Sequence, residues 1–159
     1  MAVVDQSALS LEISRRFAAP PERVFDAWTG REWGDWLPPA TAGCVVAAID
    51  PVVGGLYLVR MTMADGRTVE ISGRYREIIR PHRLVLTWTG SYNSQETLIT
   101  VTFRPDGTGT LMTLRQDGFP EAGTRQGYET GWTGPGGSFD KLAAMLARFD
   151  RSSPGRGAA

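Results

Sequence analysis

The sequence of 159 residues contains few of the side chains that build most catalytic and metal centres. Cys44 is its one cysteine and His82 its one histidine. A single cysteine cannot form an intrachain disulfide, and one cysteine with one histidine cannot supply the ligand cluster of a metal site. We therefore expect no metal, no cofactor and a reducing, cytoplasmic location.

Excess charge and long apolar runs are missing as well. The sequence has 17 basic and 17 acidic residues, so its formal net charge is zero. This balance argues against a nucleic-acid partner or an anionic membrane. No window reaches the length of a membrane span, and the N-terminus lacks the basic start and apolar run of a signal peptide. We expect one domain over residues 8–150 and a disordered tail, rich in Ser, Gly and Pro, over residues 151–159.

Alternating apolar and polar residues predict a series of β-strands. In the hairpin over residues 69–88, Ile71 and Tyr75 share one face of the first strand, and Leu86 and Trp88 share one face of the second. The hairpin therefore has one apolar, aromatic face and one polar face. The predicted strands cover residues 9–17, 43–49, 56–63, 69–79, 84–88, 96–104 and 108–116.

Helical signals flank this series of strands. Pro21 suits the first turn of a short helix over residues 22–29, and a second short helix is predicted over residues 31–36. After the last strand, residues 121–132 include three glycines, which are poor helix formers. Ser138 is a good N-cap for a final helix. The apolar face of that helix comprises Phe139, Leu142, Met145, Leu146 and Phe149.

Several stretches in a fixed order carry a resemblance to a known family. They are APPERVFDAWT, Trp36-Leu37-Pro38, GGLYLVRM, GRYREIIRPHRLVLTW, TVTFRPDGTGTLMTL and Gly131-Trp132. Together they make residues 9–149 resemble the activator of heat-shock-protein-90 ATPase homologue family, within the START-like, Bet v 1-like (SRPBCC) superfamily. The resemblance implies an α+β helix-grip fold. In this fold, a curved antiparallel sheet of about six or seven strands wraps a long C-terminal helix, and two short helices follow the first strand.

One departure from the family pattern concerns the C-terminal helix. The segment TGPGGS separates Trp132 from Phe139 and is longer than the family pattern has there. Glycine and proline interrupt helices. The sequence therefore predicts that this helix is kinked or split beside the cavity.

A sheet that grips a helix tends to enclose a hollow, so inward aromatic, methionine and other apolar residues are candidates for a ligand-binding cavity. The alternative is that the same residues form an ordinary packed core. The candidates are Trp28, Trp36, Tyr57, Met61, Met63, Ile71, Tyr75, Trp88, Phe103, Met112, Leu114, Gln116, Tyr128 and Trp132.

Few residues are candidates for catalysis. Alternation places Glu77 on the same face as Tyr75, and an inward carboxylate must be paired or meet a ligand. Glu77 is therefore the candidate acid–base residue, with a solvent-exposed strand end as the alternative. His82 lies in a turn, away from the expected cavity, and Cys44 has no neighbouring histidine to activate it. We interpret these two residues as structural.

Three functions stay open. The first is binding of a hydrophobic or aromatic small molecule between the sheet and the C-terminal helix. The second is a polyketide cyclase-like or hydrolase-like enzyme that uses the same cavity. The third, which the family name implies, is a co-chaperone that stimulates a heat-shock ATPase; it ranks last, because the eukaryotic activators carry a further domain before this one. A homodimer paired through the edge strand over residues 9–17 also stays open.

Overall fold

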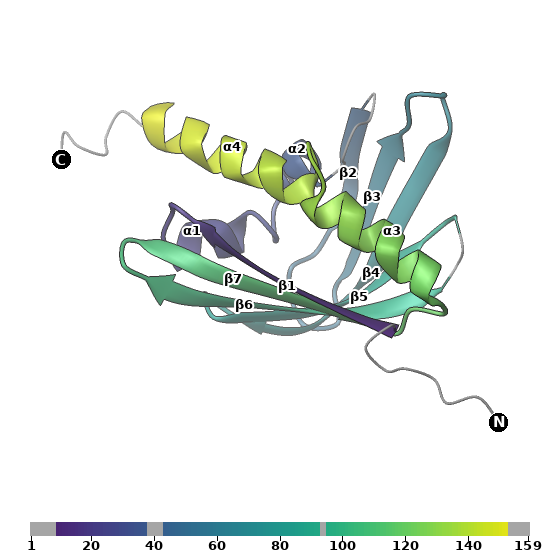
Figure 1. Cartoon of the computed structure of the whole chain (residues 1–159), viewed down its shortest axis with the longest axis horizontal. Helices are drawn as coiled ribbons and strands as arrows, with labels where there is room; N and C mark the ends of the chain where they lie inside the picture. Colours follow the sequence, from purple (N-terminus) through teal and green to yellow (C-terminus); the bar gives the residue numbers. More distant parts are fainter. Residues whose placement is uncertain (1–8, 38–42, 93–94, 153–159) are drawn as a thin grey trace.

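The computed structural model describes residues 9–37, 43–92 and 95–152. Its seven strands are β1 (Ser10–Phe17), β2 (Gly43–Ile49), β3 (Leu56–Thr62), β4 (Thr68–Ile79), β5 (Arg83–Gly90), β6 (Glu96–Asp106) and β7 (Gly109–Asp117). They form one antiparallel sheet in the order β1-β7-β6-β5-β4-β3-β2. The sheet is curved, and the C-terminal helices cross its concave side (Figure 1).

Within the described residues, four helices accompany the sheet: α1 (Pro21–Asp26), α2 (Trp33–Trp36), α3 (Ala122–Thr133) and α4 (Ser138–Ser152). Pro20 is extended and caps α1, while Pro21 occupies the start of this helix, where a missing N–H costs nothing. The predicted α+β helix-grip fold is confirmed, including the two short helices after the first strand. None of the helices in the described part of the chain is long and apolar enough to cross a membrane.

The C-terminal helical arm is split where the TGPGGS segment predicts it. Helix α3 ends at Thr133, and α4 begins at Ser138. Gly136 has a φ of 71°, a left-handed conformation that glycine adopts without strain. Trp132 and Phe139 stack across the break, with ring centroids 5.3 Å apart. The two helices therefore stay in contact although the backbone between them is not helical.

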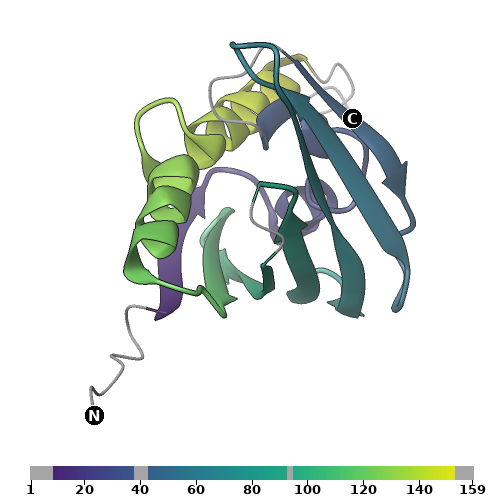
Figure 2. The same cartoon turned by 90° about the vertical axis from the view of Figure 1, so that its right-hand side faces the viewer.

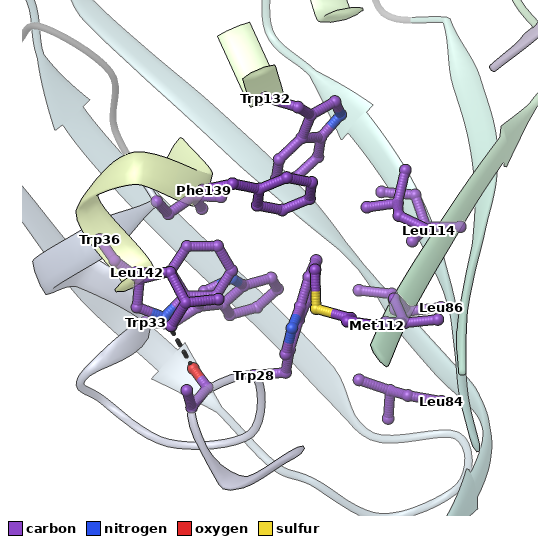
Figure 3. Close-up of a cluster of buried hydrophobic side chains, with 14 of the residues drawn as sticks. Trp28, Trp33, Trp36, Leu84, Leu86, Met112, Leu114, Trp132, Phe139 and Leu142 are labelled. Carbon is purple, nitrogen blue, oxygen red and sulfur yellow. Dashed lines mark hydrogen bonds between the residues drawn. The ribbon is translucent and has the colours of Figure 1, made fainter. Parts of the chain in front are cut away.

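The hydrophobic core fills the space between the concave face of the sheet and the helices (Figure 3). Trp28, Trp33 and Trp36 come from the short helical region and are fully buried. The indole of Trp36 donates a hydrogen bond to the carbonyl oxygen of Ala27 at 3.0 Å, which ties this region together. Four members of the predicted apolar face of α4 are buried as well. These are Phe139, Leu142, Met145 and Leu146.

The final helix is slightly longer than the sequence predicts. Helix α4 reaches Ser152, two residues into the predicted tail. The rest of that tail, residues 153–159, lies outside the described residues, as does the side chain of Phe149.

Candidate ligand-binding site

A pocket of about 470 Å³ lies between α3 and the strands β3, β4 and β5. Helix α3 and the β3–β4 hairpin stand on opposite sides of this end of the molecule (Figure 2). The volume of the pocket is within the range of pockets that hold small molecules. The described residues that line it are Leu37, Met61, Met63, Arg67, Val69, Ile71, Trp88, Tyr92, Thr124, Gly127, Tyr128, Gly131, Trp132 and Ser138.

The floor of the pocket is apolar and deeply buried. Met61, Ile71, Trp88 and Trp132 line it, and each is at most 7% exposed. The strand register brings Met61 and Ile71 to the same side of the sheet: Met61 pairs with Val69 across β3 and β4, and alternate residues of each strand face the concave side. An apolar ligand would find mainly thioether, aliphatic and indole surface here.

Two of the positions at which helix α3 lines the pocket are glycine. Thr124, Gly127, Tyr128 and Gly131 fall three, four and seven residues apart, which places them on one side of the helix. A Cβ atom added at Gly127 or Gly131 would meet no atom within 4 Å. Glycine costs a helix interior about 1 kcal/mol relative to alanine. These two glycines therefore keep space open at a cost in helix stability.

A hydrogen-bonded group of aromatic residues joins α3 to the end of β5. The indole of Trp88 donates to the hydroxyl oxygen of Tyr128 at 3.2 Å, and the hydroxyls of Tyr92 and Tyr128 are hydrogen-bonded to each other. Burial raises the pKa of the Tyr128 phenol above its ordinary value. Tyr128 is therefore a neutral polar group in the wall of the pocket.

Only part of the predicted cavity set lines this pocket. Met61, Met63, Ile71, Trp88, Tyr128 and Trp132 do so. The other eight do not line it and lie packed in the core, each at most 1% exposed. These eight are Trp28, Trp36, Tyr57, Tyr75, Phe103, Met112, Leu114 and Gln116. We therefore leave them out of the proposed contact set, because helices and neighbouring rings fill the space in front of them.

Gln116 has a structural role behind the pocket wall. Its side-chain oxygen accepts a hydrogen bond from the indole of Trp132 at 3.0 Å, and its amide nitrogen donates to the hydroxyl of Thr97 at 2.9 Å. Gln116 is completely buried, so both of these bonds are needed to offset its desolvation. The inward polar residue found in the sequence therefore fixes the orientation of Trp132.

Glu77 points away from the pocket, which corrects the expectation drawn from alternation. The register of β4 against β5 shifts at a bulge, so that Tyr75 pairs with Leu86 but Glu77 pairs with Val85. Because Val85 and Leu86 face opposite sides of the sheet, the bulge moves Glu77 to the face opposite Tyr75. The carboxylate lies 3.0 Å from Arg83 in a partly exposed ion pair.

Several lining residues were absent from the sequence-based set. Two of them had a usable signal: Gly127 and Gly131 lie at helical spacing beside Tyr128 and Trp132. The remaining ones come from turns, helix ends or ordinary apolar strand positions, and no local pattern marks them. They are Leu37, Arg67, Val69, Tyr92, Thr124 and Ser138.

Comparison with known families identifies the chain. The family model described as Activator of Hsp90 ATPase homolog 1-like protein matches residues 18–147. The chain belongs to this family. The resemblance inferred from the sequence motifs is thereby confirmed, and the Bet v 1-like, helix-grip architecture agrees with it. Comparison with curated proteins finds no match.

Several solved structures have the same architecture as this chain. A protein from Chromobacterium violaceum is 29% identical, with a TM-score of 0.78 over 86% of this chain and 96% of that chain. A protein from Rhodobacter sphaeroides is 27% identical, with a TM-score of 0.77 over 92% of this chain and 97% of that chain. An Hsp90 activator from Plasmodium falciparum is 24% identical, with a TM-score of 0.68 over 87% and 96%, a likeness that shows the fold alone.

Proposed function

We propose that this member of the Hsp90-activator homologue family binds an apolar or aromatic small molecule in the pocket between α3 and strands β3 to β5. The observation that carries the proposal is the pocket itself, which combines a volume of about 470 Å³ with a buried apolar floor. Burial of apolar surface is the main favourable term in such binding, at about 25 cal/mol per Å² before the costs of association.

The glycine face of α3 supports the same proposal. An alanine at Gly127 or Gly131 would meet no neighbouring atom, so packing within the protein does not require glycine there. Alanine would also make a more stable helix. A ligand that lies against this face of the helix explains both glycines, because it would occupy the space that a methyl group would take.

Native mass spectrometry of protein purified gently from its own cells tests the proposal. We expect one discrete added mass that disappears when the protein is denatured. The same preparation should bind the neutral fluorescent probe N-phenyl-1-naphthylamine at one saturable site, once any bound occupant is removed. An unliganded mass together with no saturable probe binding would refute the proposal.

The variant Gly131→Leu is the control for the location of the site. Its side chain extends into the pocket, since Gly131 lines the pocket with open space in front of it. We expect this variant to fold, as judged by circular dichroism, and to lose probe binding. Retained binding would place the probe elsewhere on the protein.

The two other functions considered from the sequence receive less support. The cyclase or hydrolase hypothesis depended on an inward Glu77, and no carboxylate, histidine or cysteine is among the described residues that line the pocket. The co-chaperone hypothesis depends on the family name; a test for stimulation of a heat-shock ATPase by the purified protein would decide it. A cytoplasmic location and a homodimer paired through β1, which lies at one edge of the sheet, stay predictions.

A further inference from the structure

We infer that the ligand of this pocket carries an anionic group, and that Arg67 binds this group at the pocket rim. The inference rests on the proposed function, because it assigns a chemical class to the molecule that occupies the same pocket. It would make the ligand an amphipathic organic acid, with its apolar part on the floor and its acidic end at the β3–β4 turn.

The lining side chains are buried at the floor of the pocket and exposed to solvent at its rim. Ile71 and Trp132, on the floor, are at most 3% exposed. Tyr92, at the rim, is 50% exposed, and the side chain of Arg67 is 67% exposed. A bound molecule would therefore have one end surrounded by apolar side chains and the other end near water. Such a site favours a molecule that is apolar at one end and polar at the other.

The charged side chain that lines the pocket is cationic. Arg67 is the one charged side chain among the described residues that line the pocket. The acidic residue beside it, Asp65, pairs with it at 2.9 Å but does not line the pocket. Exposed ion pairs of this kind contribute little, from about 0 to 1 kcal/mol, so an anionic group of a ligand can compete with Asp65 for the arginine at little cost.

The contacts of Asp65 also orient the guanidinium. One carboxylate oxygen of Asp65 accepts the backbone N–H of Arg67 at 2.9 Å, and the other accepts its Nε–H at 2.9 Å. These bonds use the Nε side of the guanidinium and leave both terminal Nη nitrogens available for a further acceptor. A planar guanidinium can bind the two oxygens of a carboxylate or sulfonate through such an edge.

Two dyes with the same ring skeleton test the inference. N-phenyl-1-naphthylamine is neutral, and 8-anilinonaphthalene-1-sulfonate adds one anionic group. In the variant Arg67→Gln, we expect sulfonate-dye binding to weaken about two- to fivefold, as for one exposed charge contact, and neutral-dye binding to stay unchanged. In the unmodified protein, added salt should weaken binding of the sulfonate dye only.

Arg60→Gln is the matched control. Arg60 lies on the adjacent strand β3, is about half exposed and pairs with Glu70, but does not line the pocket. The two variants change the net charge equally, so an effect of total charge would appear in both. We expect Arg60→Gln to leave the binding of both dyes unchanged.

The outcomes separate this inference from the proposed function. Weaker binding of the sulfonate dye, but not of the neutral dye, in Arg67→Gln and not in Arg60→Gln supports the inference. If both dyes bind but Arg67→Gln weakens them equally, or if Arg60→Gln has the same effect, the inference is refuted and the proposed function stands. If neither dye binds, the proposed function is refuted and the inference with it.

Discussion

Replacing Gly127 with alanine should make the protein more stable and its binding weaker. Gly127 lies in the middle of α3, where alanine is favoured over glycine by about 1 kcal/mol. The added Cβ would meet no atom within 4 Å, so no steric cost within the protein opposes this gain. For a chain of this size, 1 kcal/mol raises the melting temperature by about 2–4 °C.

Because Gly127 lines the pocket, we expect the same methyl group to reduce the room for a ligand. Overpacking a filled site by one methyl group costs about 1 kcal/mol at the low end, which is about fivefold in the dissociation constant. The assay pairs thermal unfolding of the unliganded protein with fluorescence titration of N-phenyl-1-naphthylamine. We expect a higher melting temperature together with a higher dissociation constant.

Gly123→Ala is the control within the same helix. Gly123 does not line the pocket, and the nearest contact of its added Cβ is a carboxylate oxygen of Glu121 at 3.7 Å. We expect a smaller gain in stability, because the position is in the first turn, and no change in binding. If Gly127→Ala weakens binding no more than this control, the ligand does not lie against α3. If Gly127→Ala lowers the melting temperature, the space beside the helix is not open.

Three further predictions concern residues behind and away from the pocket. Gln116→Leu leaves the indole N–H of Trp132 without its acceptor. The free energy of unfolding, measured by urea denaturation, should fall by about 1–3 kcal/mol. An unchanged free energy of unfolding would contradict the structural role of this amide. Glu77→Gln should leave dye binding unchanged and alter the free energy of unfolding by at most about 1 kcal/mol, because the carboxylate forms only a partly exposed ion pair. Loss of dye binding in this variant would show that Glu77 contributes to the site. Burial raises the pKa of the phenols of Tyr57 and Tyr75, so the folded chain holds these protons while the unfolded chain releases them above about pH 10. The stabilisation from these two phenols should therefore be fully present below that pH and fall as the pH rises further. Absorbance at 295 nm should show the phenolates of Tyr57 and Tyr75 only as the protein unfolds.

The order of the strands along the chain was predictable because the alternation of apolar and polar side chains is a local signal. The predicted strand over residues 43–49 coincides with β2, and the other strands differ from their predicted bounds by only a few residues. The split in the C-terminal helix was predictable for the same reason, since Gly134 and Pro135 act on the backbone next to them. Each of these features depends on residues close together in sequence.

The site was less predictable, because it depends on distances between elements. Met112 and Met61 both point to the concave side of the sheet, yet only Met61 lines the pocket. What separates them is how closely helices and rings pack in front of each strand, which no single stretch of sequence reports. The bulge after Tyr75 is a similar case, since residues 75–77 read as ordinary alternation. Gly127 was recognised in the sequence as a poor helix former, but its low helix propensity does not by itself indicate that the residue lines a pocket.

Methionine methyl groups allow the most direct test of the proposed site. Met61 and Met63 line the pocket, whereas Met112 and Met145 are buried outside its lining. In protein labelled with ¹³C at the methionine methyl groups, titration with N-phenyl-1-naphthylamine should shift the resonances of Met61 and Met63, because an aromatic ring would lie against them. The resonances of Met112 and Met145 should stay in place. Shifts confined to Met112 and Met145, or no shift at saturating probe, would contradict binding between α3 and strands β3 to β5.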